Sequence, residues 1–142
     1  MSEYNAVMEA KDIVQWSLVR LNEINQKIFA IRQRFIEIHS IVEGTVWPDL
    51  YFCGKECLGC PHLRWIRWQK NLKPNPLKKW LATRIEGNPR NYFLSKNQHK
   101  NSITERLALM KEISSLLKEK EMLVKYLGGL KKMKTIYSNR SQ

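Results

Sequence analysis

Three cysteines and a histidine lie within ten residues of this 142-residue chain, and the chain contains no other cysteine. The candidate ligands are Cys53, Cys57, Cys60 and His62. Three thiols and one imidazole form a four-ligand set that structural zinc prefers. Small or turn-forming residues separate them and let the backbone direct the side chains to one point: Gly54, Gly59 and Pro61. The segment predicts a structural metal centre, and the softness of its ligands favours zinc.

The spacing leaves two other interpretations open. Zinc ligands usually come as two pairs a dozen or more residues apart, whereas three, two and one residues separate these four. Cysteines at such intervals resemble the signature of radical-SAM enzymes, which hold a four-iron cluster. Those enzymes usually have an aromatic residue where this chain has Gly59, and their barrel needs a longer chain. The last interpretation is three free or disulfide-forming thiols, although the odd cysteine count argues against a secreted disulfide framework. A variant of the metal site leaves His62 as a bystander, with a water or a partner group as the fourth ligand.

The segment before the cysteines predicts one long helix over residues 2–43, with Ser2 as a candidate N-cap. Its apolar residues recur at alternating steps of three and four, and Ser17 is the exception: Val7, Ala10, Val14, Ser17, Leu21, Ile24, Ile28, Ile31, Phe35, Ile38 and Val42. This pattern is typical of a coiled-coil seam, which a second helix must cover. A few more apolar residues widen the face: Ile13, Leu18, Phe29, Ile36 and Ile41.

The end of the chain predicts that second helix, over residues 102–137. Ser102 and Glu105 have the spacing of a capping box. Heptad positions are occupied by Leu109, Ile113, Leu116, Leu123, Leu127 and Leu130, with Lys120 in an otherwise apolar slot. We expect Gly128 and Gly129 to end or kink the helix. Residues 138–142 should form a frayed tail.

Between the two helices, residues 44–101 predict a basic, aromatic metal module. Gly44 can supply a left-handed helix cap, and residues 50–52 and 63–69 favour two short strands on either side of the cysteines. Residues 80–85 fit a strand and a helical turn equally well. The predicted fold is therefore mostly α with a small β insert: two long helices form an antiparallel coiled-coil hairpin that carries a zinc-ribbon-like module at its turn.

The net charge of +12 is concentrated after the cysteines. Residues 61–101 contain ten Lys or Arg against Glu86 alone, while residues 1–50 contain five against seven Asp or Glu. Such a surface favours a polyanionic partner, with nucleic acid ahead of an anionic membrane. The candidate contacts combine cations for phosphates with tryptophans for base stacking: Arg64, Trp65, Arg67, Trp68, Lys70, Lys73, Lys78, Lys79, Trp80, Arg84 and Arg90.

These features predict a small zinc-binding accessory protein that binds DNA or structured RNA. The wide apolar face of the first helix supports an alternative, a helical interaction module that docks on a larger nucleic-acid enzyme or on a second copy of the chain. An iron–sulfur protein is the remaining alternative. No catalytic constellation is apparent, so we do not expect an enzyme. The chain has no run of 18 apolar residues and no signal-peptide pattern, so we expect a cytoplasmic protein without a membrane partner.

The order of these features resembles a family of small prokaryotic and mobile-element proteins, in which a Cys-Gly-Lys segment opens a metal ribbon between two helices. The matching residues are Cys53, Gly54, Lys55, Cys57, Cys60, His62, Trp65 and Trp68. The chain departs from that family's His-Gly-Pro-aromatic stretch, because Leu63 and Arg64 follow His62. The resemblance implies a metal ribbon on helices and an origin on a phage or mobile element, and it supplies no activity. The family's occurrence on mobile elements favours a nucleic-acid task.

Overall fold

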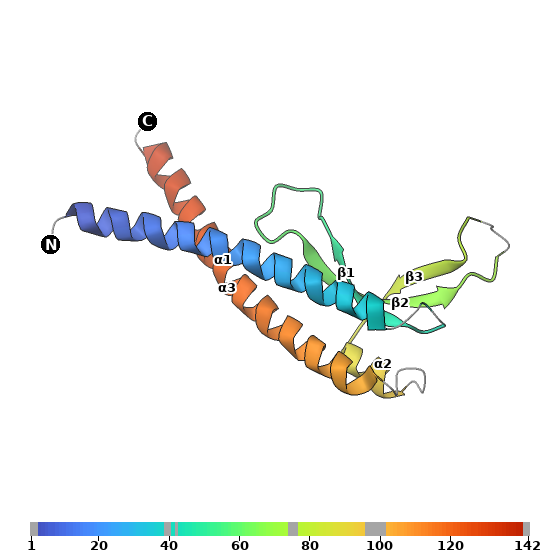
Figure 1. The fold of residues 1–142 in the computed structure, drawn as a ribbon. Helices are drawn as coiled ribbons and strands as arrows, with labels where there is room; N and C mark the ends of the chain where they lie inside the picture. Colours follow the sequence, from blue (N-terminus) through green and yellow to red (C-terminus); the bar gives the residue numbers. More distant parts are fainter. Residues whose placement is uncertain (1–2, 39–40, 42, 74–76, 96–101, 141–142) are drawn as a thin grey trace.

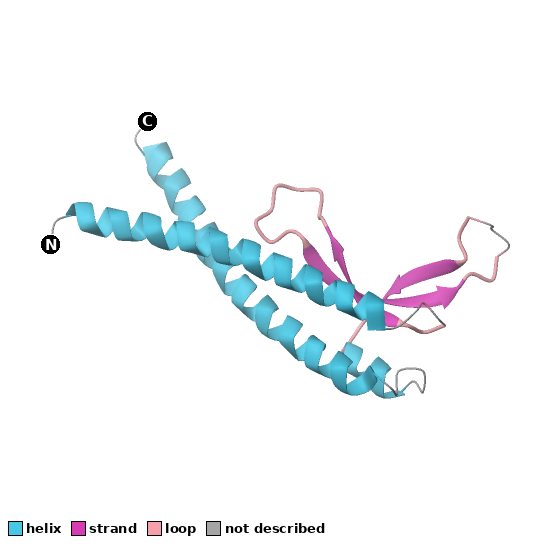
Figure 2. Cartoon of the chain, viewed as in Figure 1, coloured by secondary structure: helices cyan, strands magenta, loops and turns pink. Residues whose placement is uncertain are grey.

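The computed structural model of this chain describes residues 3–38, 41, 43–73, 77–95 and 102–140. In chain order its elements are α1 (Glu3–Ile38), β1 (Val46–Tyr51), β2 (His62–Lys70), β3 (Trp80–Arg84), α2 (Pro89–Ser95) and α3 (Ile103–Arg140). The described part is mostly helical with a small antiparallel sheet, which confirms the prediction of a mostly α fold with a small β insert (Figure 2). α1 and α3 lie beside each other and run in opposite directions (Figure 1).

Two ion pairs fix the alignment of α1 and α3. The Arg20 guanidinium binds both carboxylate oxygens of Glu119 at 2.7 Å, and Arg34 Nε lies 2.6 Å from Glu105 Oε1. Arg34 lies fourteen residues after Arg20 on α1, and Glu105 lies fourteen residues before Glu119 on α3, as an antiparallel pair requires. The Arg20 hydrogen bonds also hold the pKa of Glu119 below its usual value. The Arg34–Glu105 pair is exposed and the Arg20–Glu119 pair is partly buried. Because solvent-accessible pairs add little stability, their main effect is to select one register.

The predicted seam forms the interface between the helices. On α1 the buried seam residues are Ser17, Leu21, Ile24, Ile28, Ile31 and Phe35, and on α3 they are Ile113, Leu116, Lys120, Leu123 and Leu127. The Ser17 hydroxyl donates to the carbonyl of Ile13 at 2.8 Å, so this polar exception is satisfied within its own helix. Val7, Ala10 and Val42 lie outside the side chains that the structure describes.

The first helix is shorter than predicted, and the first strand begins earlier. α1 ends at Ile38 rather than at residue 43; Ser2 and residues 39, 40 and 42 lie outside the described residues. Gly44 has the predicted positive φ, 86°, but it belongs to a turn that leads directly into β1. β1 starts at Val46, not at residue 50, because Val46 and Trp47 are buried in the sheet. Pro48 is tolerated there because β1 is an edge strand.

The sheet is a meander with the order β1-β2-β3, so β2 is central and its two loops lie at opposite ends. Residues 52–61, which contain the cysteines, join β1 to β2, and residues 71–79 join β2 to β3. At about 3.3 Å per residue, β2 separates the two loops by about 26 Å. The metal module therefore does not sit as a whole at the turn of the helices: the cysteine loop lies back along them, and the basic loop points away (Figure 1).

β3 and α2 are the elements that sequence patterns left open or missed. Residues 80–84 form a strand and not a helical turn, because they pair with Ile66–Lys70 of β2. α2 was not predicted, although its start carries a known signal. The Arg90 amide donates to the Asn88 side-chain oxygen at 3.0 Å, and Pro89 occupies the first helical position. An Asn-Pro pair can thus begin a helix as well as a turn.

An aromatic cluster joins α1, β2 and α2. The ring centroids of Phe35 and Trp65 are 5.5 Å apart, and Phe93 lies 6.0 Å from both rings. The Arg106 guanidinium of α3 is buried against the Phe93 ring, and its Nε donates to Ser102 Oγ at 2.7 Å. Burial lowers the pKa of Arg106 to about 10. Phe35 therefore contacts the sheet and α2 from within the helical seam.

Gly128 and Gly129 do not end the second helix, because α3 continues to Arg140. A Cβ atom added at Gly129 would meet nothing within 4 Å. Since glycine in a helix interior costs about 1 kcal/mol relative to alanine, Gly129→Ala should raise the unfolding free energy by about that amount. Urea denaturation measures it. The control is Gly87→Ala, which should lower stability by about 1 kcal/mol because Gly87 has φ of 95°; an unchanged midpoint for Gly129→Ala would contradict the helix continuation.

Candidate metal centre

The loop between β1 and β2 brings together all four predicted ligands. One ligand atom from each of Cys53, Cys57, Cys60 and His62 lies within 4.8 Å of the others. Cys53 Sγ and Cys60 Sγ are 3.4 Å apart, and Cys57 Sγ lies 3.6 Å from His62 Nε2. The three cysteines form no disulfide. A metal ion such as zinc could therefore bind at the centre of this group.

Two of the separations among the four ligand atoms are close to those around one tetrahedral ion. Zinc bonds of about 2.3 Å to sulfur and about 2.0 Å to nitrogen place two sulfurs about 3.8 Å apart, and a sulfur and a nitrogen about 3.5 Å apart. The observed 3.4 Å and 3.6 Å are close to these edges of a tetrahedron. In a four-iron cluster each cysteine binds its own iron, so the sulfurs point away from one another. The close approach of Cys53 and Cys60 therefore favours a single ion.

The glycines in the loop are required by its geometry. Gly54 has φ of 77°, a conformation that residues with a Cβ rarely adopt. A Cβ at Gly59 would lie 3.2 Å from His62 Cε1 and 3.6 Å from Cys57 Sγ, so a side chain there would crowd two ligands. The backbone amide of Cys53 also points to Cys60 Sγ at 3.5 Å. The loop backbone thus allows the ligands to approach one another.

Crowding of the thiols shifts their proton affinities in opposite directions. A backbone hydrogen bond at Lys55, together with contacts to Cys60 and His62, lowers the pKa of Cys53 to about 7. At Cys60 a backbone hydrogen bond from Cys53 acts in the same direction, but burial and the neighbouring thiols outweigh it and raise the pKa. The first thiolate therefore opposes the second. A cation bound among them would remove this repulsion, because metals bind the thiolate form.

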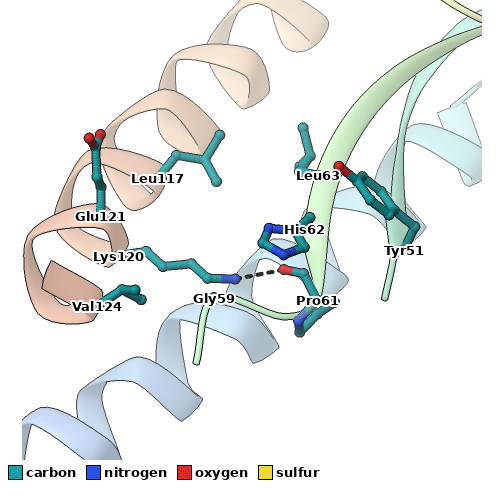
Figure 3. Close-up of a pocket in the computed structure, with 9 residues that line it drawn as sticks. All are labelled: Tyr51, Gly59, Pro61, His62, Leu63, Leu117, Lys120, Glu121 and Val124. Carbon is teal, nitrogen blue, oxygen red and sulfur yellow. Dashed lines mark hydrogen bonds between the residues drawn. The ribbon is translucent and has the colours of Figure 1, made fainter. Parts of the chain in front are cut away.

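A lysine from α3 supports the loop from behind. Lys120 is only 6% exposed, and its Nζ donates to the Pro61 carbonyl at 2.7 Å, between the ligands Cys60 and His62 (Figure 3). Burial lowers the pKa of the Lys120 ammonium, and the charges of Cys60 and Cys57 act in the opposite direction. A cavity of about 270 Å³ separates the loop from α3, and its lining includes Tyr51 and Leu117.

Lys120 is the residue that sequence reasoning recognised as unusual but did not assign. Its position in an apolar heptad slot was the only signal, since the contact with Pro61 spans 59 residues of sequence. Zn²⁺ with three thiolates carries a net charge of −1. The positive charge of the Lys120 ammonium would offset that charge. Its hydrogen bond to the Pro61 carbonyl also holds the backbone between the ligands Cys60 and His62 in place. Its burial in the seam thus has a reason in the neighbouring site.

Lys120→Met tests this support. Methionine fits an apolar seam but cannot bond Pro61, so zinc affinity should fall by about 10–100-fold, as is typical for residues that hold metal ligands in place. Competition with a chromophoric chelator measures the affinity. Lys118→Met, an exposed substitution on the same helix, is the matched control and should bind zinc like the native chain. Equal affinities for the two variants would show that Lys120 does not support the site.

Comparison of the chain with protein-family models, curated proteins and solved structures gave no match. The family resemblance inferred from the cysteine segment therefore stays a prediction. None of the helices in the described part of the chain is long and apolar enough to cross a membrane. The function must accordingly be argued from the side chains themselves.

Two of the three predicted stacking residues, Trp65 and Trp68, are packed within the fold. Trp65 packs against Phe35 and Phe93, and Trp68 packs edge-on against Trp47 with centroids 5.4 Å apart. Trp80 begins β3 and is half-buried. Core packing thus uses Trp65 and Trp68, because a small sheet has few other residues with which to cover its faces.

Two of the predicted arginines are also engaged within the fold. Arg64 Nη2 lies 3.3 Å from Asp49 Oδ2, and its guanidinium stacks over Tyr51 at 5.0 Å. The Arg67 guanidinium lies 5.8 Å from the centre of the Tyr92 ring. Arg84 and Arg90 are exposed, on β3 and α2. The arginines are therefore spread over the sheet and α2 and do not form one row.

The predicted lysines are grouped more closely than the arginines. Lys70 ends β2, Lys73 lies in the loop that follows, and Lys78 and Lys79 are the last two residues of that loop before β3. All four are exposed. They surround the end of the β2–β3 hairpin, which lies opposite to the cysteine loop. The cationic surface that the sequence predicted is thus centred on this hairpin.

Proposed function

We propose that Cys53, Cys57, Cys60 and His62 hold one structural zinc ion in a zinc-ribbon-like module, and that the sheet it supports binds nucleic acid. The convergence of four ligand atoms within 4.8 Å carries the metal assignment. A closed set of four ligands leaves no open coordination position, which favours a structural role over a catalytic one. Elemental analysis should find one zinc per chain, and a protein without bound metal after expression in zinc-supplemented medium would contradict the proposal.

The lysine group on the β2–β3 hairpin supports the nucleic-acid part. From His62 to Ile85 the sequence contains no Asp or Glu. Asp49 pairs with Arg64 and the Glu43 carboxylate accepts from the Lys70 amide, and the remaining cations leave the hairpin with a net positive charge. The lysine ammonium is carried on a long, flexible side chain, which suits contacts with the closely spaced negative charges of phosphates. The zinc loop would act at the far end of β2, where it closes the sheet against α3 through Lys120.

A fluorescence-anisotropy titration at several salt concentrations tests nucleic-acid binding. Each phosphate contact contributes about 0.9 to the slope of log affinity against log salt on duplex DNA. Replacing Lys73, Lys78 and Lys79 with glutamine should therefore lower the slope by about 2.7 if each makes one contact. Glutamine at Lys11, Lys111 and Lys118 changes the charge equally but lies on the helices, and should leave the slope nearly unchanged. Absence of binding, or equal slopes for both variants, would contradict the proposal.

Exposed apolar side chains on α1 favour a second candidate function, docking on another protein or on a second copy through a coiled-coil-like surface. Ile13, Trp16, Val19 and Phe29 are all exposed, and Trp16 is an unusually large side chain to leave in water. Light scattering tests this candidate. A native chain that is monomeric across micromolar concentrations, and whose mass does not change with Trp16→Ala, would exclude self-association.

A further inference from the structure

Two leucines near the end of the β2–β3 hairpin are the most exposed large apolar side chains in the part of the chain that the structure describes. Leu72 is 92% exposed and Leu77 is 91% exposed. Each leucine directly precedes a lysine, since Lys73 follows Leu72 and Lys78 follows Leu77. A single exposed leucine is ordinary, but two in the loop of one hairpin, within a lysine group, combine apolar and cationic side chains in one short segment, which we call the tip.

The hairpin presents this tip from a supported base. The Asn71 amide donates to the Lys79 carbonyl at 2.9 Å, and the Asn71 side chain donates to the Lys78 carbonyl at 2.8 Å. The Lys73 amide donates in turn to the Asn71 side-chain oxygen at 3.1 Å. These bonds join the two sides of the loop directly below the leucines. The ladder between β1 and β2 ends at Val46 and Arg67, but Gly44 and Thr45 still bond the backbone of Trp68, and the Glu43 carboxylate accepts from the Lys70 amide. The hairpin is therefore supported up to Lys70, and only its loop extends beyond that support (Figure 1).

From this arrangement we infer that the β2–β3 hairpin is a DNA-bending arm, whose leucines insert between base pairs of duplex DNA while the lysines contact the adjacent phosphates. The inference rests on the proposed nucleic-acid function and specifies its ligand and its action. Apolar side chains act as wedges in this way at the minor groove, where they partly unstack a base step and kink the duplex. Two-stranded ribbons are among the elements that enter DNA grooves.

The composition of the tip favours DNA over an anionic membrane, which shares the same charge chemistry. Anchors at a membrane surface usually combine a broad apolar face with tryptophan or tyrosine at the interface. The described residues of the tip, 71–73 and 77–79, include no aromatic side chain. A wedge needs only one or two apolar groups, which matches Leu72 and Leu77. The lysines on either side then meet phosphates on both sides of the opened step.

A duplex of about 30 base pairs with a donor and an acceptor dye at its ends tests the inference, because a kink shortens the end-to-end distance and raises energy transfer. The zinc-loaded native chain should raise energy transfer. Leu72→Ala combined with Leu77→Ala should still bind with the same salt slope, but energy transfer should return to that of the free duplex. The matched control, Leu18→Ala with Met122→Ala, removes two exposed apolar side chains from the helices and should bend DNA like the native chain.

The outcomes separate this inference from the proposed function. Binding without bending by the native chain, or equal bending by the leucine variant, would overturn the wedge but leave nucleic-acid binding intact. No binding of the native chain to DNA would overturn both. Phosphatidylserine vesicles distinguish the membrane source: vesicle binding that the leucine variant loses, in a chain that does not bind the duplex, would identify the arm as a lipid-binding tip and overturn the inference.

Discussion

Cys57→Ser is expected to lower the zinc affinity of this protein by more than about 100-fold. Residues that merely hold metal ligands in place contribute up to that factor, so the loss of a ligand should exceed it. The Cys57 thiol lies 3.6 Å from His62, and serine would supply a poor oxygen donor at the same place. Competition with a chromophoric chelator gives the affinity, and elemental analysis gives the stoichiometry of the purified variant.

Glu56→Gln is the matched control for this ligand variant, since it changes an exposed residue next to Cys57 without removing a donor. It should bind one zinc with native affinity. Chelation of the native metal should loosen the loop but spare the helices, because the buried apolar core contains no residue of the segment 52–61. Hydrogen exchange should therefore increase in that segment while the helical circular dichroism is retained. Native zinc affinity for Cys57→Ser would remove the basis of the metal assignment.

Phe35→Ala is expected to destabilise the fold by about 3–5 kcal/mol, the usual cost of deleting a buried phenylalanine ring. Phe35 is 1% exposed and joins α1 to Trp65 of β2 and to Phe93 of α2. Its removal leaves a cavity where three elements meet, and neighbouring rings are too rigid to fill it. Urea denaturation followed by circular dichroism measures the loss.

Phe29→Ala provides the comparison within the same helix. Phe29 is 51% exposed, so the same substitution should change the unfolding free energy by no more than about 0.5 kcal/mol. Both substitutions also change helix propensity by the same amount, so the difference between them isolates the aromatic cluster. A cost for Phe35→Ala close to that of Phe29→Ala would mean that α1 does not hold the sheet through this ring.

Local patterns predicted the parts of the fold that depend on local chemistry. The seam from Ser17 to Phe35 and the strand around Trp65 follow from periodicity and β propensity, and both are confirmed. The metal ligands were predictable because their residue types are rare and lie close together in sequence. The resulting prediction of a cluster that could hold a metal is confirmed.

What the sequence did not reveal depends on partners far away along the chain. The contact of Lys120 with Pro61 joins residues that no local pattern relates. Gly128 and Gly129 continue a helix because packing outweighs their low propensity, and Pro48 lies in a strand because it is at an edge. The placement of Trp65 in the core rather than on a binding surface likewise follows from Phe35 and Phe93.

The ion pairs between α1 and α3 restrict how this protein could transmit a signal. If α3 slipped by one heptad in either direction, either Arg20 or Arg34 would face Glu112, and the other arginine would lose its carboxylate. The same slip would carry Lys120 away from Pro61. The pair of α1 and α3 therefore resists sliding of one helix along the other. A conformational change at the far end of this pair would reach the metal loop by bending or separation of the helices, since sliding breaks the alignment on which that loop depends.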